Sequence, residues 1–359
     1  MGFGSIMTTS YIYYGTTETG ENDGLFCQAF DAATGDLGEL KGVAKGPSTG
    51  FQAISLDRTI LYSMCQSDEG LGGVRSYYID GTSGELSLIS EEFSIGGKPC
   101  YIGLDRSEKF LLVASYNDAV VTVFPIAEGG QIQPYSFTAQ HEGGTGIVAD
   151  RQGEAHTHSI YADPTNRYVF VCDLGNDEVV VYRFDSEKGT LIPVDGASVA
   201  MAPGAGPRHL AFHPNGDWVY VINELDSTVT HFLWNADQGK LVQQGTVPTL
   251  PADFEGDNLT AEIIVSQDGR FVYGSNRGHD SIVVYLVNQE TGALSFVQRT
   301  SVGGGHPRNF SIDPSGAFLV AANRDTDNVV FFRIDGESGQ IEATGVEVAV
   351  KGSICVRFA

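Results

Sequence analysis

Long apolar runs, paired cysteines and positive charge are all scarce in this sequence. No apolar stretch reaches the roughly 18 residues that suggest a transmembrane helix, and MGFGSIMTTS at the N-terminus lacks the charged and apolar regions of a secretory signal. The five cysteines are odd in number and form no Cys-x-x-Cys pair, which argues against a disulfide framework or a zinc site. We therefore expect a cytoplasmic protein with free thiols.

Positive charge is limited to 21 lysines and arginines against 45 acidic residues, a formal net charge of −24. Such an acidic chain repels phosphates, so we expect neither nucleic acid nor a membrane as a partner. Any local cluster of the fourteen arginines is correspondingly informative. The 45 glycines and many short runs of Val, Ile, Phe and Tyr favour an all-β architecture.

A turn element of the form Asp-x-x-x-Gly-x-Leu recurs along the chain, for example in DGTSGEL (Asp80–Leu86) and DSEKGTL (Asp185–Leu191). Its central glycines are Gly35, Gly84, Gly130, Gly189, Gly239, Gly292 and Gly339. Their spacings of 49, 46, 59, 50, 53 and 47 residues define seven units. Each glycine follows a strand pattern and supplies the positive φ that a tight hairpin turn needs.

A polar turn before an aromatic strand, as in HPNGDWVYV (His213–Val221), is a second recurring element. Two hairpin turns per unit imply four antiparallel strands, so seven units predict a seven-bladed β-propeller. The C-terminal SICVRF (Ser353–Phe358) resembles inner strands such as PRNFSI (Pro307–Ile312), whereas the N-terminal strand (Tyr11–Tyr14) follows no inner strand. We expect the C-terminal strand to close the first blade and residues 1–359 to form one domain.

The fifth unit illustrates where functional side chains meet. Strands are predicted at His209–His213 and Asp217–Asn223, which places Arg208 and Glu224 side by side at one sheet edge. Two insertions read as loops, a long one over Thr138–Glu154 and a shorter one over Thr249–Thr260. Long loops on rigid scaffolds often carry function.

Alignment of the units gives two columns of residues, at the start of each inner strand and at the end of each second strand. Both columns should open on the same face of the ring, near its axis. The later units contribute charged and titratable residues to this place: His158, Arg208, Glu224, Arg277, Arg308 and Arg324, with His156, Glu262 and His306 close by. Arginines bind carboxylate or phosphate well, and Glu224 and His158 are candidate proton-transfer groups. The cluster predicts an anion-binding pocket with one acid/base pair.

Less specific interpretations exist for several of these residues. Each arginine taken alone is better explained by a structural ion pair across blades, for instance with Glu224, Glu262, Asp173 or Asp325. The coincidence of column position across several blades favours the pocket for the cluster as a whole. The spacing of His156 and His158 suits a metal, but no third ligand is evident and the arginines would repel a cation, so no metal is expected. Cys100 is interpreted as a packing residue.

These residues carry a resemblance to a known family. Over essentially its full length the chain resembles the seven-bladed-propeller lactonases, which include bacterial 6-phosphogluconolactonases and fungal 3-carboxy-cis,cis-muconate lactonizing enzymes. The matching segments include RQGEAHTHS (Arg151–Ser159), GAGPRHLAFHPNG (Gly204–Gly216), VINELDSTV (Val221–Val229) and DGRFVYGSNRGHDSI (Asp268–Ile282). The resemblance implies a site of His158, Arg208, Glu224 and Arg277 that requires no metal or organic cofactor.

Three functions fit the sequence. For the two catalytic ones we expect a small anionic lactone or a polycarboxylate as substrate. The protein is expected to act as a monomer or a weak homo-oligomer. The first, which we favour, is hydrolysis of 6-phosphogluconolactone in the pentose phosphate pathway. Glu224 or His158 would activate water, Arg208 or Arg277 would stabilise the oxyanion, and Arg308 and Arg324 would hold the phosphate. The second is a muconate cycloisomerase that uses the same residues, and the third is a non-catalytic binding propeller.

Overall fold

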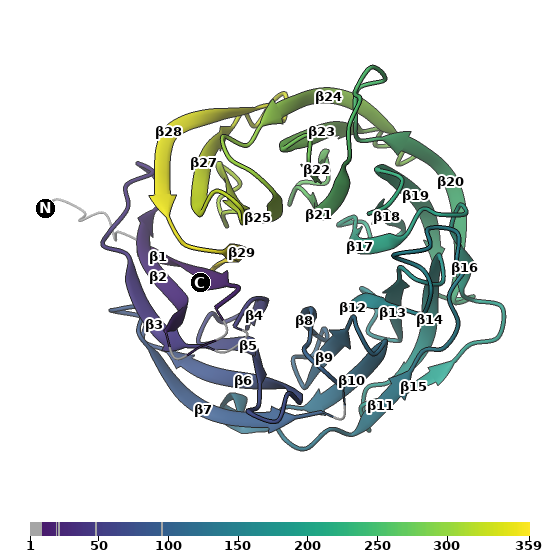
Figure 1. Ribbon diagram of the computed structural model, residues 1–359, viewed down its shortest axis with the longest axis horizontal. Helices are drawn as coiled ribbons and strands as arrows, with labels where there is room; N and C mark the ends of the chain where they lie inside the picture. The colour runs from purple at the N-terminus through teal and green to yellow at the C-terminus, as the bar shows by residue number, and fades with distance from the viewer. Residues whose placement is uncertain (1–8, 19, 21, 47–48, 95) are drawn as a thin grey trace, which may run out of the picture.

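Seven antiparallel sheets stand around a central axis in the computed structural model, which describes residues 9–359 except 19, 21, 47–48 and 95 (Figure 1). Within each sheet the strands follow one another from the axis outward in chain order, except in the first blade. That blade consists, from the axis outward, of β29 (Ser353–Phe358), β1 (Thr9–Thr16), β2 (Asp23–Asp31) and β3 (Lys41–Lys45). The predicted propeller and its closure by the C-terminal strand are confirmed.

The remaining blades contain the rest of the strands. The second blade has β4 (Gln52–Ile54), β5 (Ile60–Gln66), β6 (Gly72–Ile79) and β7 (Leu86–Phe93). The third has β8 (Tyr101–Leu104), β9 (Phe110–Ser115), β10 (Val120–Pro125) and β11 (Phe137–Gln140), with a short 3-10 helix, η1 (Glu128–Gly130), between the last two. The fourth has β12 (Thr157–Ala162), β13 (Tyr168–Asp173), β14 (Glu178–Asp185) and β15 (Thr190–Pro193), plus the short β16 (Val199–Ala200) paired with β14.

The last three blades are regular. The fifth has β17 (Pro207–Phe212), β18 (Trp218–Asn223), β19 (Thr228–Asn235) and β20 (Lys240–Pro248). The sixth has β21 (Leu259–Val265), β22 (Phe271–Arg277), β23 (Ser281–Val287) and β24 (Leu294–Ser301). The seventh has β25 (Pro307–Ile312), β26 (Phe318–Asn323), β27 (Asn328–Ile334) and β28 (Ile341–Ala349). In the described part of the chain, no helix has the length and apolar character that a membrane crossing needs.

The two recurring sequence elements meet where neighbouring blades touch. All seven turn glycines have positive φ, from +61° at Gly239 to +84° at Gly35. A Cβ on Gly239, in the fifth blade, would lie 2.8 Å from the ring of Tyr168 in the fourth blade. A Cβ on Gly189 would likewise lie 2.2 Å from Phe110 of the preceding blade. The turn glycine therefore allows the tight turn and also leaves room for an aromatic ring from the previous blade.

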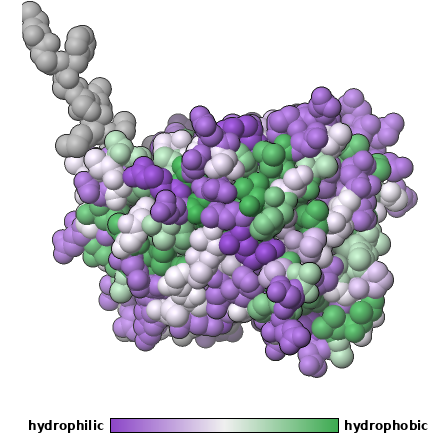
Figure 2. Space-filling model, turned by 90° about the horizontal axis from the view of Figure 1, so that it is seen from above, coloured by the Kyte–Doolittle hydropathy of each residue, from purple (hydrophilic) through white to green (hydrophobic). Residues whose placement is uncertain are grey.

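Apolar side chains fill the space between blades. Every residue of β18 is buried, and so is every residue of β9 and β26, as expected for strands covered on both faces. Phe170 of β13 and Trp234 of β19 pack edge to face across one such interface, with ring centroids 4.7 Å apart. On the outer wall, hydrophobic and hydrophilic residues are interspersed (Figure 2), as befits outermost strands exposed on one side.

Local predictions can be compared with the observed elements. The hairpin of the fifth blade forms as predicted, within one or two residues at each end. The long insertion begins slightly later than predicted, because Thr138–Gln140 pair with β10 as the end of β11. The shorter insertion ends at Asn258, one residue before β21 begins.

Candidate active site

A cavity of about 480 Å³ opens near the axis, lined mainly by residues of the inner strands and of the ends of the second strands. Seven of the nine predicted site residues line it: His158, Arg208, Glu224, Arg277, His306, Arg308 and Arg324. Residues that the sequence did not single out for the site also line it, among them Lys98, Cys100, Tyr116, Arg151 and His209. One wall is apolar and is formed by Phe51, Met64, Pro99 and Ile354. The two alignment columns thus meet at one place, as expected.

Irregular strand pairing turns several of these side chains toward the axis. In β17, Pro207 pairs with Asn223 and His209 with Ile222, so Arg208 is an extra residue in the ladder. His158 in β12 and Arg308 in β25 occupy equivalent bulges. A bulge re-aims a side chain and is frequent next to active sites. The same distortion therefore recurs in three blades at the residue that faces the cavity.

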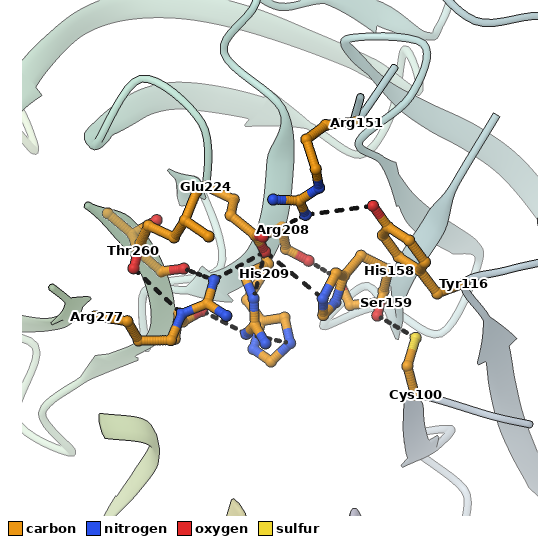
Figure 3. Close-up of polar contacts among 12 residues, drawn as sticks. Cys100, Tyr116, Arg151, His158, Ser159, Arg208, His209, Glu224, Thr260 and Arg277 are labelled. Atoms are coloured by element: carbon orange, nitrogen blue, oxygen red, sulfur yellow. Dashed lines mark hydrogen bonds and ion pairs between the residues drawn. The ribbon is translucent and has the colours of Figure 1, made fainter. Parts of the chain in front are cut away.

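Glu224 is the centre of the charged cluster (Figure 3). Arg208 Nε donates to its Oε2 at 2.8 Å, and Arg277 Nη2 lies 3.1 Å from the same oxygen. Arg151 Nη2 donates to Oε1 at 2.5 Å. The side chain of Glu224 is only 3% exposed, so these ion pairs are shielded from solvent. The interpretation of Arg208 and Arg277 as ion-pair partners of Glu224 therefore also holds.

These guanidinium groups determine the ionisation of Glu224. Burial alone would raise its pKa, but the charges of Arg277, Arg208 and Arg151 outweigh burial and hold the pKa well below its usual range. The carboxylate is ionised at neutral pH. Both of its oxygens already accept hydrogen bonds from arginines, which leaves little basicity for a reacting proton.

His158 has the opposite electrostatic environment. Burial and the charge of Arg208 lower its pKa well below the usual value, against the attraction of Glu224, so the ring is neutral. Nε2 lies 3.8 Å from Glu224 Oε2. Nδ1 is buried without a hydrogen-bond partner among the described residues. The site therefore holds a neutral imidazole beside a permanent carboxylate.

A chain of hydrogen bonds through His209 to Glu262 holds the Arg208 side chain in place. Glu262 Oε1 lies 2.8 Å from His209 Nδ1, and His209 Nε2 lies 3.1 Å from Arg208 Nη1. Because an arginine only donates, Nε2 is the acceptor and Nδ1 carries the proton that is donated to Glu262. Burial lowers the pKa of His209 to about 4, consistent with this neutral form. Glu262, predicted to bind substrate, supports Arg208 through His209 in this arrangement.

The long insertion contributes Arg151. Residues 141–156 run from β11 to β12, and Gln152 in this loop is fully buried. Its side-chain amide donates to Asp177 Oδ1 at 2.7 Å and to the carbonyl of Leu174 at 2.9 Å. Arg151 thereby reaches Glu224 and also contacts the hydroxyl of Tyr116 at 3.3 Å.

This architecture can be compared with known proteins. The model of a family described as "Lactonase, 7-bladed beta-propeller" matches residues 11–358. The chain belongs to this lactonase family. The 6-phosphogluconolactonase of Bacillus subtilis (strain 168) is 39% identical over 351 residues, which cover 98% of this chain and 99% of that protein. A protein of the same name from Formosa agariphila is 34% identical over 346 residues, 94% of this chain and 96% of that protein.

Solved structures agree with this assignment of the lactonase family. The structure described as the periplasmic gluconolactonase PpgL of Pseudomonas aeruginosa matches with a TM-score of 0.90 and 32% sequence identity. The match covers 98% of this chain and 99% of that one. A putative 6-phosphogluconolactonase from Bacteroides fragilis also has a TM-score of 0.90, at 28% identity, and the match covers 99% of each chain.

Two predicted substrate-binding residues are placed differently by the lactonase fold. His156 stacks on the ring of Tyr116, with centroids 4.2 Å apart, and does not line the cavity. Its Nδ1 lies 3.0 Å from the carbonyl oxygen of Tyr116. Within the described residues, no group of three or more His, Cys, Asp or Glu side chains is arranged to hold a metal ion. Substrate binding by His156, as by Glu262, stays a prediction that these contacts do not favour.

The lactonase cavity also contains residues that the sequence did not assign to the site. Arg151 opens the family segment RQGEAHTHS, and this motif was the available signal for its role. Cys100, expected to be a packing residue, lines the cavity, but its thiol donates to the carbonyl of His158 at 3.1 Å and burial raises its pKa to about 12. The thiol is therefore protonated and unreactive at neutral pH.

Arg277, His306 and Arg324 form the remaining side of the charged cluster. Arg277 donates to the carbonyl oxygens of Leu259 at 3.2 Å and Thr260 at 2.6 Å, which fixes its plane. The ring of His306 lies between Arg277 Nη1 and Arg324 Nη2, at 3.5 and 3.3 Å, and burial lowers its pKa to about 4. Arg324 donates to Asp325 at 2.6 Å, the structural ion pair considered from the sequence.

Proposed function

We propose that this protein hydrolyses 6-phosphogluconolactone to 6-phosphogluconate. The observation that carries the proposal is a neutral, buried His158 beside an arginine-rich cavity, in a member of the lactonase family. The two related proteins named 6-phosphogluconolactonase, each similar over nearly the whole chain, support this choice of substrate. The cavity of about 480 Å³ is large enough for a sugar-sized lactone.

His158 is the proton acceptor in this mechanism. A water molecule attacks the lactone carbonyl carbon and gives its proton to His158 Nε2, which lies 3.8 Å from Glu224. The imidazolium that forms is stabilised by the Glu224 carboxylate. Collapse of the tetrahedral intermediate breaks the bond between the carbonyl carbon and the ring oxygen, and His158 returns the proton to the departing alkoxide. The net change is the addition of one water, which yields a hydroxyl group and a carboxylic acid that then ionises.

Arg208 stabilises the developing oxyanion. Its Nε and Nη1 groups are held by Glu224, His209 and the carbonyl of Ala261. Its Nη2 group has no hydrogen-bond partner among the described residues and is the donor available to a substrate oxygen. A donor fixed in advance costs no reorganisation when charge develops.

A cytoplasmic monomer is the form that we propose to be active. All five cysteines are unpaired, which suits a reducing compartment.

The test is hydrolysis of freshly prepared 6-phosphogluconolactone above its spontaneous rate, measured as 6-phosphogluconate released. Arg208→Ala should lower kcat by roughly 100-fold or more, since loss of one oxyanion donor costs about 2.7–4 kcal/mol. The separate His158→Gln variant should lose most of the enzymatic rate. Arg183→Gln, which removes an exposed arginine from β14, is the matched control and should behave as wild type.

Folding of each variant is checked by thermal unfolding. A loss of less than about threefold in a folded Arg208→Ala variant would contradict the oxyanion role. No turnover by folded wild-type protein would contradict the proposed function. Muconate cycloisomerisation would then be the next reaction to assay.

A further inference from the structure

Two cationic side chains face the cavity without an acidic partner. Arg308 occupies the bulge of β25 in the seventh blade, and Lys98 lies just before β8 in the third. Both are half-buried, and neither makes a hydrogen bond or an ion pair with any described residue. The other cavity arginines differ, since Arg151, Arg208 and Arg277 pair with Glu224 and Arg324 pairs with Asp325.

The electrostatic environment of this pair is repulsive. Burial, and then the charge of Arg308, lower the pKa of Lys98. Burial and the charges of Arg208 and Arg324 outweigh the attraction of Glu224 and lower the pKa of Arg308 to about 10, so Arg308 is still protonated at neutral pH. A buried charge without a partner is costly. A bound anion would relieve both the desolvation and the repulsion.

The two side chains approach the cavity from different parts of the ring. In Figure 1, β8 and β25 lie on opposite sides of the central opening. The apolar wall formed by Phe51, Met64, Pro99 and Ile354 borders the same cavity. A phosphate ester suits these surroundings, because its oxygens accept from two cations and its carbon chain packs against apolar groups.

We propose that Lys98 and Arg308 together form the subsite for the phosphate group of the substrate and thereby set the preference for a phosphorylated over an unphosphorylated lactone. The proposal rests on the proposed function and specifies how the site recognises its substrate. It replaces the expected pair of Arg308 and Arg324, because Arg324 is already held by Asp325. Lys98 takes the place of Arg324.

Kinetics with two lactones test the subsite. Arg308→Gln and Lys98→Met should each raise KM for 6-phosphogluconolactone by about 10- to 100-fold, the usual effect of losing a charge-assisted hydrogen bond. The values of kcat/KM for glucono-δ-lactone, which has no phosphate, should change by less than about threefold. Arg183→Gln and Lys240→Met remove exposed cations of the same kinds and are the matched controls. Equal losses on both lactones would overturn the proposal and make these residues part of the reaction centre.

Thermal unfolding with sodium phosphate gives a readout that does not depend on turnover. Phosphate should raise the Tm of wild-type protein in a concentration-dependent way and should raise it less in both variants. Without phosphate, both variants should be as stable as wild type or more so, since an unpaired cation has been removed. If phosphate binding is lost in the variants but no lactone is hydrolysed, the subsite stands and the proposed function fails. If 6-phosphogluconolactone is hydrolysed with unchanged KM in both variants, the subsite fails and the function stands.

Discussion

Glu224 is surrounded by more positive charge than one carboxylate can neutralise. Three guanidinium groups donate to it or lie within 3.1 Å of its oxygens, and the imidazole of His158 lies 3.8 Å away. Burial of an ion pair is favourable only when its geometry and remaining hydrogen bonds are satisfied. Glu224 therefore acts as a fixed counter-ion that orients arginines, and His158 is left as the group able to exchange a proton. The sequence alone made these two residues equal candidates.

The pH dependence of hydrolysis follows from the lowered pKa of His158. An imidazole whose pKa lies well below 6.5 stays in its basic form at lower pH than an ordinary histidine. We expect kcat/KM for glucono-δ-lactone to be constant from about pH 8 through pH 6.5, the ordinary histidine value, and to decline only well below it. This substrate is chosen because it carries no titrating phosphate, and spontaneous hydrolysis is subtracted at each pH. An acid limb centred at pH 6.5 or above would show that His158 has an ordinary pKa or is not the base.

At the scale of strands and loops, recurrent bulges make the site. The alignment columns placed Arg208, His158 and Arg308 near the axis from spacing alone. The bulges that turn them inward have no composition signal, since PRH, THS and PRN look like ordinary strand starts. Lys98 was missed, although the alignment offered a signal for it. Cys100 and Arg308 stand in the same column, and Lys98 precedes Cys100 by two residues just as His306 precedes Arg308. Arg151 was missed because an insertion without periodicity cannot be aligned to the other blades.

The insertion is held by Asp177, a residue that no sequence pattern singles out. Its Oδ1 accepts from Gln152 and from the backbone amide of Gly206, both at 2.7 Å, and its Oδ2 accepts from the amide of Gly204 at 2.7 Å. The carboxylate thus joins the loop that carries Arg151 to the segment that leads into Arg208.

Asp177→Asn should release this loop, because the new amide group presents hydrogens to donors that then lack an acceptor. Each unsatisfied buried donor costs about 1–3 kcal/mol. We expect kcat/KM for 6-phosphogluconolactone to fall roughly 10- to 100-fold through displacement of Arg151, and trypsin to cleave after Arg151 faster than in wild type. Asp195→Asn, at an exposed position between β15 and β16, is the control. Unchanged cleavage at Arg151 together with unchanged kinetics would show that Asp177 does not position the loop.

At the scale of the whole molecule, β29 holds the ring together. It pairs with β1 along its length, and Ser311 Oγ and Asn309 Oδ1 from the seventh blade bond to the backbone of Val356 at 2.7 and 2.8 Å. On its other side, Arg357 Nε donates to the carbonyl of Gln52 in the second blade at 3.1 Å. One strand of six residues is thus bonded to three blades. Ring closure was predictable because an inner-strand pattern stands at the C-terminus with no counterpart at the N-terminus.

Removal of residues 353–359 should therefore affect more than one blade. The truncated chain exposes the edge of β1, where Ile12 and Tyr14 are fully buried in the intact protein. It also removes partners of Asn309 and Gln52 and opens the apolar wall at Ile354. An uncovered, apolar strand edge promotes association between chains. We expect the variant to lose its single cooperative thermal transition and to elute as aggregates in size-exclusion chromatography. A monomer with a Tm within a few degrees of wild type would show that the other six blades hold the ring without the closing strand, and that the contacts of β29 are dispensable for the fold.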